Sequence, residues 1–365
     1  MEQVVPRSRE KIPATAIDGV HDDRSDTSRE WNPDDGLNWW TNGFWGGMLW
    51  MMYHATGKEE YAQAARISEE KMDQCFEQYY GLHHDVGFMW IPTAVADYRL
   101  TGNEDSRRRG MHAANLLAGR FNPVGKFIRA WNDGANDTDT RGWAIIDCML
   151  NLNLLYWAYK ESRDPRFRQI AMAHADTAME HFVRGDGSVK HIVEFNPETG
   201  EEVCDYGGQG YAPGSSWTRG QSWGLYGFIL SYLHTGREAY LDTAKKIAHY
   251  FMANIPEDGL IPVDFRQPAE PVLYDDTAAA IAACGLIEIA GAVPELEKEL
   301  YLSAAVKLLK SLDEKHCDWN GNTDCFLTCC SSAYHAAKHN HSLVYADSYF
   351  LEAILKLRGT DFLLW

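Results

Sequence analysis

The sequence predicts an all-α fold, an (α/α)6 barrel in which an inner and an outer ring of helices alternate along the chain. Two observations favour this fold. Segments that are apolar nearly all round, such as GFWGGMLWMMYHA (43–55), alternate with amphipathic segments such as KEEYAQAARISEEKMDQCFE (58–77). Short corners of similar composition separate the members of each pair. They fall at His54–Gly57, Arg99–Gly102, Glu161–Asp164 and His234–Gly236, with weaker versions at Ile289–Gly291 and Leu357–Gly359.

The apolar segments are expected to form the inner ring, with their N-termini gathered at one end of the barrel. Few residues follow Gly359, so a sixth outer helix has to come from the N-terminal segment, where Pro6 and Pro13 oppose a long helix. We therefore expect residues 1–38 to supply part of the outer ring and residues 39–365 to form a single barrel domain. An incomplete ring is the alternative.

Composition and charge exclude several classes of protein. A net charge of -18 over 365 residues disfavours nucleic acids and anionic membranes as partners. The N-terminus has no apolar signal region, and no apolar run has the length of a membrane-spanning helix, so a cytoplasmic location is expected.

The eight cysteines lack the paired spacing of a disulfide framework. Cys325, Cys329 and Cys330 lie in a segment, 316–341, that is also rich in histidine, and together these side chains offer zinc ligands. However, the CxxxCC spacing matches no common structural zinc site. We expect reduced thiols, no metal and no cofactor.

Three long stretches precede inner helices, at 122–140, 184–216 and 315–342. Long loops that enter one end of a barrel usually build the binding site there. Several tryptophans also lie near loops, which suggests stacking surfaces, although packing explains any single one equally well.

Two aspartates are candidates for chemistry. Asp147 lies in the apolar segment AIIDCMLNLNLLYWAYK, with Trp143 and Asn151 expected on its helical face, and burial there should raise its pKa so that it holds a proton near neutral pH. A structural aspartate with a polar partner is the alternative. Asp85, in LHHDVGFMW, begins an inner helix, where capping and catalysis are equally plausible.

A third candidate region runs from a glycine-rich loop into the fourth inner helix. Arg219 and Trp223 share a helical face and offer a cation and a stacking plane, which suit a sugar that carries a carboxylate. Packing by Trp217 and Trp223, with Arg219 in a salt bridge, is the alternative. His191, in a strand-like segment, is a candidate for proton relay or hydroxyl binding, or is structural.

Five motifs in order resemble the unsaturated glucuronyl hydrolases of glycoside hydrolase family 88. They are WTNGFWGGMLW from Trp40, HHDVGFMW from His83, AIIDCMLNLNLLYWA from Ala144, SSWTRGQSWGLYGF from Ser215 and YADSYFLEAILKL near the C-terminus. The resemblance implies an (α/α)6 barrel. It also implies a substrate left by polysaccharide lyases, a short glycosaminoglycan oligosaccharide that ends in a 4,5-unsaturated uronic acid.

The resemblance further implies a mechanism and roles for residues. An acid protonates C4 of the vinyl ether, water adds at C5, and the resulting hemiketal opens. Asp147 would be the general acid and base, and Asp85 the second essential carboxylate, holding hydroxyls and keeping Asp147 protonated. The implied substrate contacts are His191, Gln209, Arg219 and Trp223 at the uronate, Trp40 and Trp131 stacking on sugar rings, and Ser331, Ser332 and Lys338 at the second sugar or its sulfate.

Other functions remain open at this point. An unsaturated rhamnogalacturonyl hydrolase would share the barrel and the chemistry but act on pectin fragments. A sugar epimerase of the α/α-barrel type, or a non-catalytic oligosaccharide-binding protein, would use the same fold differently. A monomer or weak homo-oligomer that binds small unsaturated oligosaccharides is expected.

Overall fold

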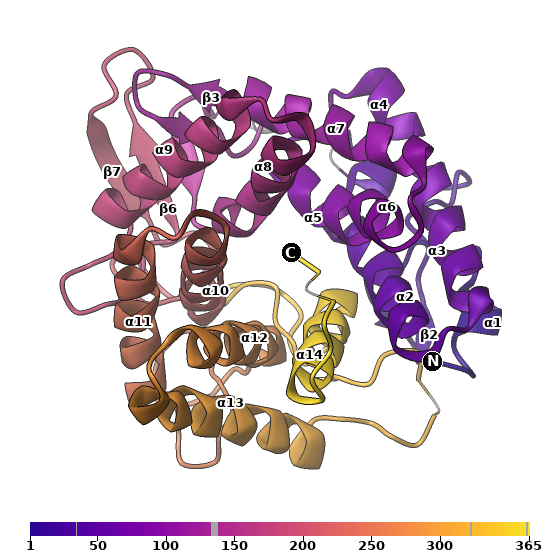
Figure 1. The fold of residues 1–365 in the computed structure, drawn as a ribbon. Helices are drawn as coiled ribbons and strands as arrows, with labels where there is room; N and C mark the ends of the chain where they lie inside the picture. The colour runs from indigo at the N-terminus through magenta and orange to yellow at the C-terminus, as the bar shows by residue number, and fades with distance from the viewer. Residues whose placement is uncertain (34, 133–137, 322, 363) are drawn as a thin grey trace.

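The computed structural model describes residues 1–33, 35–132, 138–321, 323–362 and 364–365. Six inner helical segments form a ring in which each contacts the next and the last contacts the first (Figure 1). They are α2 (Gly43–Thr56), the segment α5 to α6 (Val86–Trp90, Ala96–Thr101), α8 (Cys148–Ser162), α10 (Thr218–Thr235), α12 (Asp276–Ala292) and α14 (Val344–Leu357). The predicted (α/α)6 barrel is confirmed.

Five outer helices follow their inner partners in the chain and pack outside them. They are α3 (Glu59–Lys71), α7 (Glu104–Gly119), α9 (Pro165–His181), α11 (Glu238–Ala253) and α13 (Glu295–Lys315). A short helix, α4 (Gln74–Gln78), follows α3. Because the inner helices bury every side and the outer helices only one, the sequence pattern distinguishes the two rings.

The corners end the inner helices as the sequence predicts, with one exception. Gly57, Gly102 and Gly236 adopt left-handed φ angles of 69°, 75° and 69°, which glycine tolerates without a steric penalty. The corner predicted at Ile289–Gly291 is wrong, because α12 continues through Gly291 to Ala292. It ends there because the next residue but one, Pro294, cannot extend the helix.

The second inner helix is interrupted. Between α5 and α6 the backbone forms a π-helical turn at Ile91–Val95. Pro92 lies in this turn and has no N–H to donate to the α-helical ladder, so the helix adopts a wider turn there.

The outer ring is irregular at its sixth position. The N-terminal helix α1 (Val5–Ser8) has only one turn, as the prolines predict, and a small hairpin of β1 (Ala16–Ile17) and β2 (Val20–His21) follows it. A cavity of about 480 Å³ lies between the first residues, the segment 318–326 and the outer face of α14. Ile12 is nevertheless fully buried, so the N-terminal segment packs on the common core.

Short strands form at the end of the barrel where the inner helices begin. β3 (Phe121–Asn122) and β4 (Phe127–Ile128) make one hairpin. An antiparallel sheet contains β5 (Trp143–Ile145), β6 (Ile192–Phe195) and β7 (Glu202–Tyr206), in that order. The prediction that helix begins at Ala144 is wrong, since β5 occupies Trp143–Ile145. No described helix has the length and apolar character needed to cross a membrane.

Candidate active site

The first residues of four inner helices bring the predicted polar side chains to one end of the barrel. Asp85 precedes α5, Asp147 precedes α8, Arg219 lies in the first turn of α10, and Asp275 precedes α12. Asp147 therefore lies at the N-cap position and not inside a helix, which corrects the sequence-based placement and removes Trp143 from its helical face. Neither Asp85 nor Asp147 uses its carboxylate to cap its helix.

Asp147 has the character of a proton donor. Burial raises the pKa of its carboxyl group to about 7, although the positive charge of Arg219 opposes this shift. Its Oδ1 atom is buried and has no hydrogen-bond partner among the described residues. The side chain as a whole is half-buried, so a ligand in the mouth can reach it. A structural aspartate would have a partner here, so this geometry favours catalysis over the alternative kept open above.

Asp85 is the second buried carboxyl group. Burial raises its pKa well above the ordinary value, and the nearby charge of Asp147 raises it further. Its Oδ1 accepts a hydrogen bond of 3.1 Å from Asn151 Nδ2, and Nδ1 of His83 and Nε2 of His84 lie 3.5 and 3.4 Å from its two oxygens. Burial is the first cause of the raised pKa of both aspartates.

Asn151 connects the helices that carry the two aspartates. Its Oδ1 accepts from the backbone N–H of Phe88 (2.8 Å), and its Nδ2 contacts both Asp85 and the carbonyl oxygen of Asp147. A side chain at Gly87 would place Cβ within 2.6 Å of the Cα atom of Asn151. Glycine is therefore required at position 87 for α5 and α8 to meet at this point.

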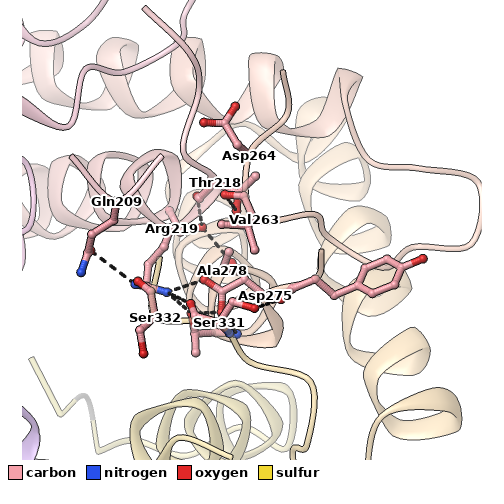
Figure 2. A network of polar contacts seen from close by, with 12 residues as sticks. Gln209, Thr218, Arg219, Val263, Asp264, Asp275, Ala278, Ser331 and Ser332 are labelled. Atoms are coloured by element: carbon pink, nitrogen blue, oxygen red, sulfur yellow. Dashed lines mark hydrogen bonds and ion pairs between the residues drawn. The ribbon is translucent and has the colours of Figure 1, made fainter. Parts of the chain in front are cut away.

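Arg219 is buried and held on several sides (Figure 2). Its guanidinium forms an ion pair with Asp275 and donates to the carbonyl oxygens of Ser331 (2.9 Å) and Ser332. It also donates to the Gln209 side chain at 3.4 Å, and its charge lies 4.6 Å from the centre of the Trp217 ring. The salt-bridge alternative for Arg219 is thus realised, and the ion pair also fixes this cation near the mouth.

The Cys- and His-rich segment is attached to the start of α12. Asp276 Oδ1 lies 2.6 Å from His316 Nδ1, and Asp276 Oδ2 accepts from the backbone N–H of Cys329 at 2.9 Å. One atom of the kind that binds metal ions comes from each of three side chains, Asp276, His316 and Cys329, and these atoms lie within 4.8 Å of one another. Cys329 is therefore grouped with Asp276 and His316 and not with Cys325 and Cys330.

His191 is fixed in one neutral tautomer. Burial lowers its pKa to about 3, and its Nδ1 accepts a hydrogen bond of 3.0 Å from the backbone N–H of Gln209. This contact is shorter than the 3.4 Å between Nδ1 and the carbonyl oxygen of Gly207, so we assign the proton to Nε2, which can donate to a ligand. Gly208, with φ of 56°, lies so close to this ring that a Cβ atom would be 2.0 Å from Nδ1.

The tryptophans predicted as platforms separate into two groups. Trp223 is fully buried between Phe88 and Tyr349, at 5.1 and 5.6 Å between ring centres, so no ligand reaches its faces and the packing alternative fits it. Trp40 and Trp131 remain partly exposed. Trp40 packs against Tyr345 at 5.0 Å, beside the Arg219 network.

The three candidates for the second sugar occupy different environments. Ser331 is fully buried, and its hydroxyl donates to the carbonyl oxygen of Tyr274 (2.8 Å). Ser332 and Lys338 are exposed. A bound ligand can therefore reach the side chains of Ser332 and Lys338 but not that of Ser331.

Two partners of the site were not predicted. Asp275 neutralises Arg219 from 56 residues away, and Tyr345 is buried beside both Arg219 and Trp40. The pair of aspartates that opens DDTAAAIAACG carried a helix-start signal that could have drawn attention to Asp275.

Buried carboxyl groups at the mouth of a helical barrel, together with partly exposed indole rings and a fixed guanidinium, suit a glycoside hydrolase, and the similarity to known proteins that follows shows that the chain belongs to this class. No protein-family model matches it. It is 37% identical over 341 residues to the unsaturated glucuronyl hydrolase of Bacillus sp. (strain GL1), covering 91% of this chain and 89% of the relative. It is 33% identical to an unsaturated chondroitin disaccharide hydrolase of Streptococcus pneumoniae, covering 89% and 83%.

Solved structures show the same similarity. One is the structure of a UGL variant with the tetrasaccharide dGlcA-Glc-Rha-Glc. Its TM-score is 0.88 at 34% sequence identity, and the match covers 98% of this chain and 94% of the UGL chain. A variant of the unsaturated glucuronyl hydrolase of Streptococcus agalactiae, complexed with dGlcA-GalNAc6S, has a TM-score of 0.82 at 28% identity, covering 100% and 90%. The chain belongs to the unsaturated glucuronyl hydrolase family.

Proposed function

We propose that this protein removes a 4,5-unsaturated uronic acid from the non-reducing end of small oligosaccharides left by polysaccharide lyases. The observation that carries the proposal is the Asp147 carboxyl group, which has a pKa of about 7, a buried oxygen without a hydrogen-bond partner in the described part of the chain and an approach from the barrel mouth. A group that holds its proton at neutral pH can protonate a carbon–carbon double bond.

The proposed reaction is a hydration. Asp147 donates its proton to C4 of the C4=C5 vinyl ether, and positive charge develops at C5 and the ring oxygen. The ionised Asp147 then takes a proton from a water molecule as that water adds at C5. The hemiketal that forms opens to a ketone at C5 and leaves a hemiacetal at C1, and collapse of this hemiacetal to an aldehyde releases the remaining sugar as an alcohol. Because the anomeric carbon is not attacked, the distance between the two carboxyl groups does not predict retention or inversion.

The other groups at the mouth position the substrate. Asp85 accepts hydrogen bonds from ring hydroxyls, and His191 donates one from Nε2. We expect the amide of Gln209 and the positive potential at the N-termini of the inner helices to favour a carboxylate, although the whole chain is acidic. Arg219, whose charge Asp275 balances, holds the Gln209 side chain in place. Trp40 and Trp131 offer ring faces to the sugars, and we assign the exposed side chains of Ser332 and Lys338 to the second sugar or its sulfate.

Loss of the absorbance of the C4=C5 bond measures this reaction directly. The wild-type enzyme should consume unsaturated disaccharides from chondroitin, hyaluronan or heparin, and Asp147→Asn should be at least about 1,000-fold slower. Faster turnover of an unsaturated rhamnogalacturonan disaccharide would favour the pectin enzyme. Retention of the chromophore while the sugar isomerises would favour an epimerase, and binding without turnover would favour a binding protein.

The cellular compartment also belongs to this proposal. All eight cysteines are free thiols, which supports a reducing compartment such as the cytoplasm. Small products of extracellular lyases would then be imported before this enzyme acts on them.

A further inference from the structure

Three side chains that have no role in the proposed reaction, and that carry metal-binding atoms, meet beside the start of α12. Asp276 is the first residue of α12, His316 directly follows α13, and Cys329 lies in the loop that leads to Ser331. A carboxylate oxygen, an imidazole nitrogen and the thiol sulfur of the three lie within 4.8 Å of one another. Because zinc bonds to these atoms are about 2.0–2.3 Å long, one ion between them can contact all three.

Backbone hydrogen bonds hold these three segments together. The backbone N–H of Asp276 donates to the carbonyl oxygen of Cys329 at 3.2 Å, and Asp276 Oδ2 accepts from the backbone N–H of Cys329 at 2.9 Å. Thr328 donates from its backbone N–H (3.3 Å) and from its hydroxyl group (3.0 Å) to the carbonyl oxygen of His316. The fold itself therefore brings the three donors together, and the N–H of Cys329 orients the carboxylate, as outer partners of metal ligands do.

The chemistry of the three donors favours zinc. Calcium and magnesium ions prefer sites made of oxygen atoms, whereas thiolate, imidazole and carboxylate groups are all regular ligands of zinc. In the bound form the thiolate of Cys329 and the carboxylate of Asp276 carry one negative charge each. Together they balance the charge of a divalent ion.

The exposure of the three side chains also suits an ion. The side chains of Asp276 and His316 are 2% and 10% exposed, and Cys329 is partly exposed. The cluster is thus largely shielded from water but can be entered from solvent. Three protein ligands leave the fourth position of a tetrahedral zinc ion to a water molecule.

We propose that Asp276, His316 and Cys329 bind one zinc ion. The expectation of no metal rested on the CxxxCC spacing, and only the middle cysteine of that motif, Cys329, belongs to this set. Its other two cysteines, Cys325 and Cys330, are buried.

The role of this zinc ion is structural. Asp275, which precedes Asp276, pairs with Arg219, and Arg219 donates to the carbonyl oxygen of Ser331, two residues after Cys329 (Figure 2). The ion therefore fastens the loop that supports Arg219 to the ends of α12 and α13, and it does not touch the substrate.

The test uses the reduced, chelator-treated chain and cobalt(II), which takes the same kinds of ligand as zinc and absorbs light. The wild type should bind one cobalt ion per chain with a sulfur-to-cobalt charge-transfer band in the near ultraviolet, and added zinc should remove this band. Cys329→Ser should lose the band. Cys204→Ser, at a partly exposed thiol on β7, is the matched control and should keep it.

Two further variants test the other ligands. Asp276→Asn and His316→Gln should weaken cobalt binding at least about 100-fold, because the loss of even an outer partner of a metal ligand costs about 10–100-fold. If both variants bound cobalt as tightly as the wild type, Cys329 would bind the ion without them and the proposal would be wrong. A wild type without the sulfur-to-cobalt band, or the same band in Cys329→Ser, would also overturn it.

The melting temperature gives a second measurement. Zinc at about 100 times its dissociation constant should raise the melting temperature of the wild type by about 3 °C and leave that of Cys329→Ser unchanged. An equal shift in both proteins would place the ion elsewhere. No substrate enters these measurements, so their result is separate from that of the test of the proposed function.

Discussion

Burial raises the pKa of Asp147 to about 7, so its carboxyl group changes from mainly protonated to mainly ionised across neutral pH. The proposed reaction uses the protonated form. We therefore expect kcat/KM to decline above a midpoint near pH 7, by about tenfold for each further pH unit. A pH–rate profile with an unsaturated disaccharide measures this decline, and activity that increases between pH 7 and pH 9 would contradict the assignment of Asp147 as the acid.

The same shift predicts a dependence of stability on pH. The pKa of Asp147 is higher in the folded chain than the ordinary value of 3.8, so the folded state binds more protons between about pH 4 and about pH 7. Stability from this group is fully present below that window and is lost as pH rises through it. The difference in unfolding free energy between wild type and Asp147→Asn should therefore change in favour of the variant by up to ~1.4 kcal/mol per pH unit.

Chemical denaturation of both proteins at several pH values gives that difference. Asp147→Asn should fold normally, because the carboxylate it replaces makes no hydrogen bond through Oδ1. A difference that stays constant from pH 4 to pH 7 would show that the pKa of Asp147 is not raised.

At the scale of elements, the start of α12 joins α10 and the segment that carries Ser331. Asp275 forms a buried ion pair with Arg219 and accepts from the backbone N–H of Ser331 at 3.4 Å. Asp275→Asn leaves the guanidinium of Arg219 without a counter-charge, and breaking a buried pair costs about 3 kcal/mol or more. Thermal and chemical unfolding measure this loss. Glu297→Gln, which breaks a partly exposed pair with Lys245, is the control and should cost at most about 1 kcal/mol.

The contact between α5 and α8 gives a second prediction at this scale. Gly87→Ala would force Cβ against the Asn151 backbone, and overpacking of this kind costs about 1–3 kcal/mol. Because Asn151 holds Asp85, activity should fall as well. Gly119→Ala at the end of α7 is the matched control, since nothing lies within 4 Å of the added atom. If the two variants were equally stable and active, the close approach would have no role.

For the whole molecule, structural features that arise from a local stretch of sequence could be predicted, and features that arise from contacts between distant residues could not. The inner helices bury every side, which the sequence displays directly, and Pro6 and Pro13 indicated that the sixth outer position holds no long helix. The start of α8 was misplaced because Trp143–Ile145 is apolar, and periodicity does not distinguish a short buried strand from the first turn of a helix. The Arg219–Asp275 pair joins residues far apart in sequence, so it could be recognised only in the closed barrel.

A buried tryptophan, Trp365, packs where the last inner helix meets the first two. Trp365 is 4% exposed, stacks on Tyr349 at 5.7 Å and donates from Nε1 to Glu352 at 3.0 Å. It also contacts Phe44 and Phe88, on the first and second inner helices. It therefore joins the inner helix α14 to the two with which the ring begins.

Trp365→Ala should remove this junction and lower the unfolding free energy by about 3–5 kcal/mol, as other buried tryptophans do. Trp319→Ala, at an indole that is 60% exposed, should change it by less than about 1 kcal/mol. Guanidinium denaturation followed by circular dichroism compares the two variants with wild type. The ring of Phe88 contacts Trp365, and its backbone N–H donates to Asn151, which holds Asp85. Trp365→Ala should therefore also slow turnover below its unfolding midpoint. A variant as stable as wild type would mean that the barrel closes through contacts between α14 and α2 alone.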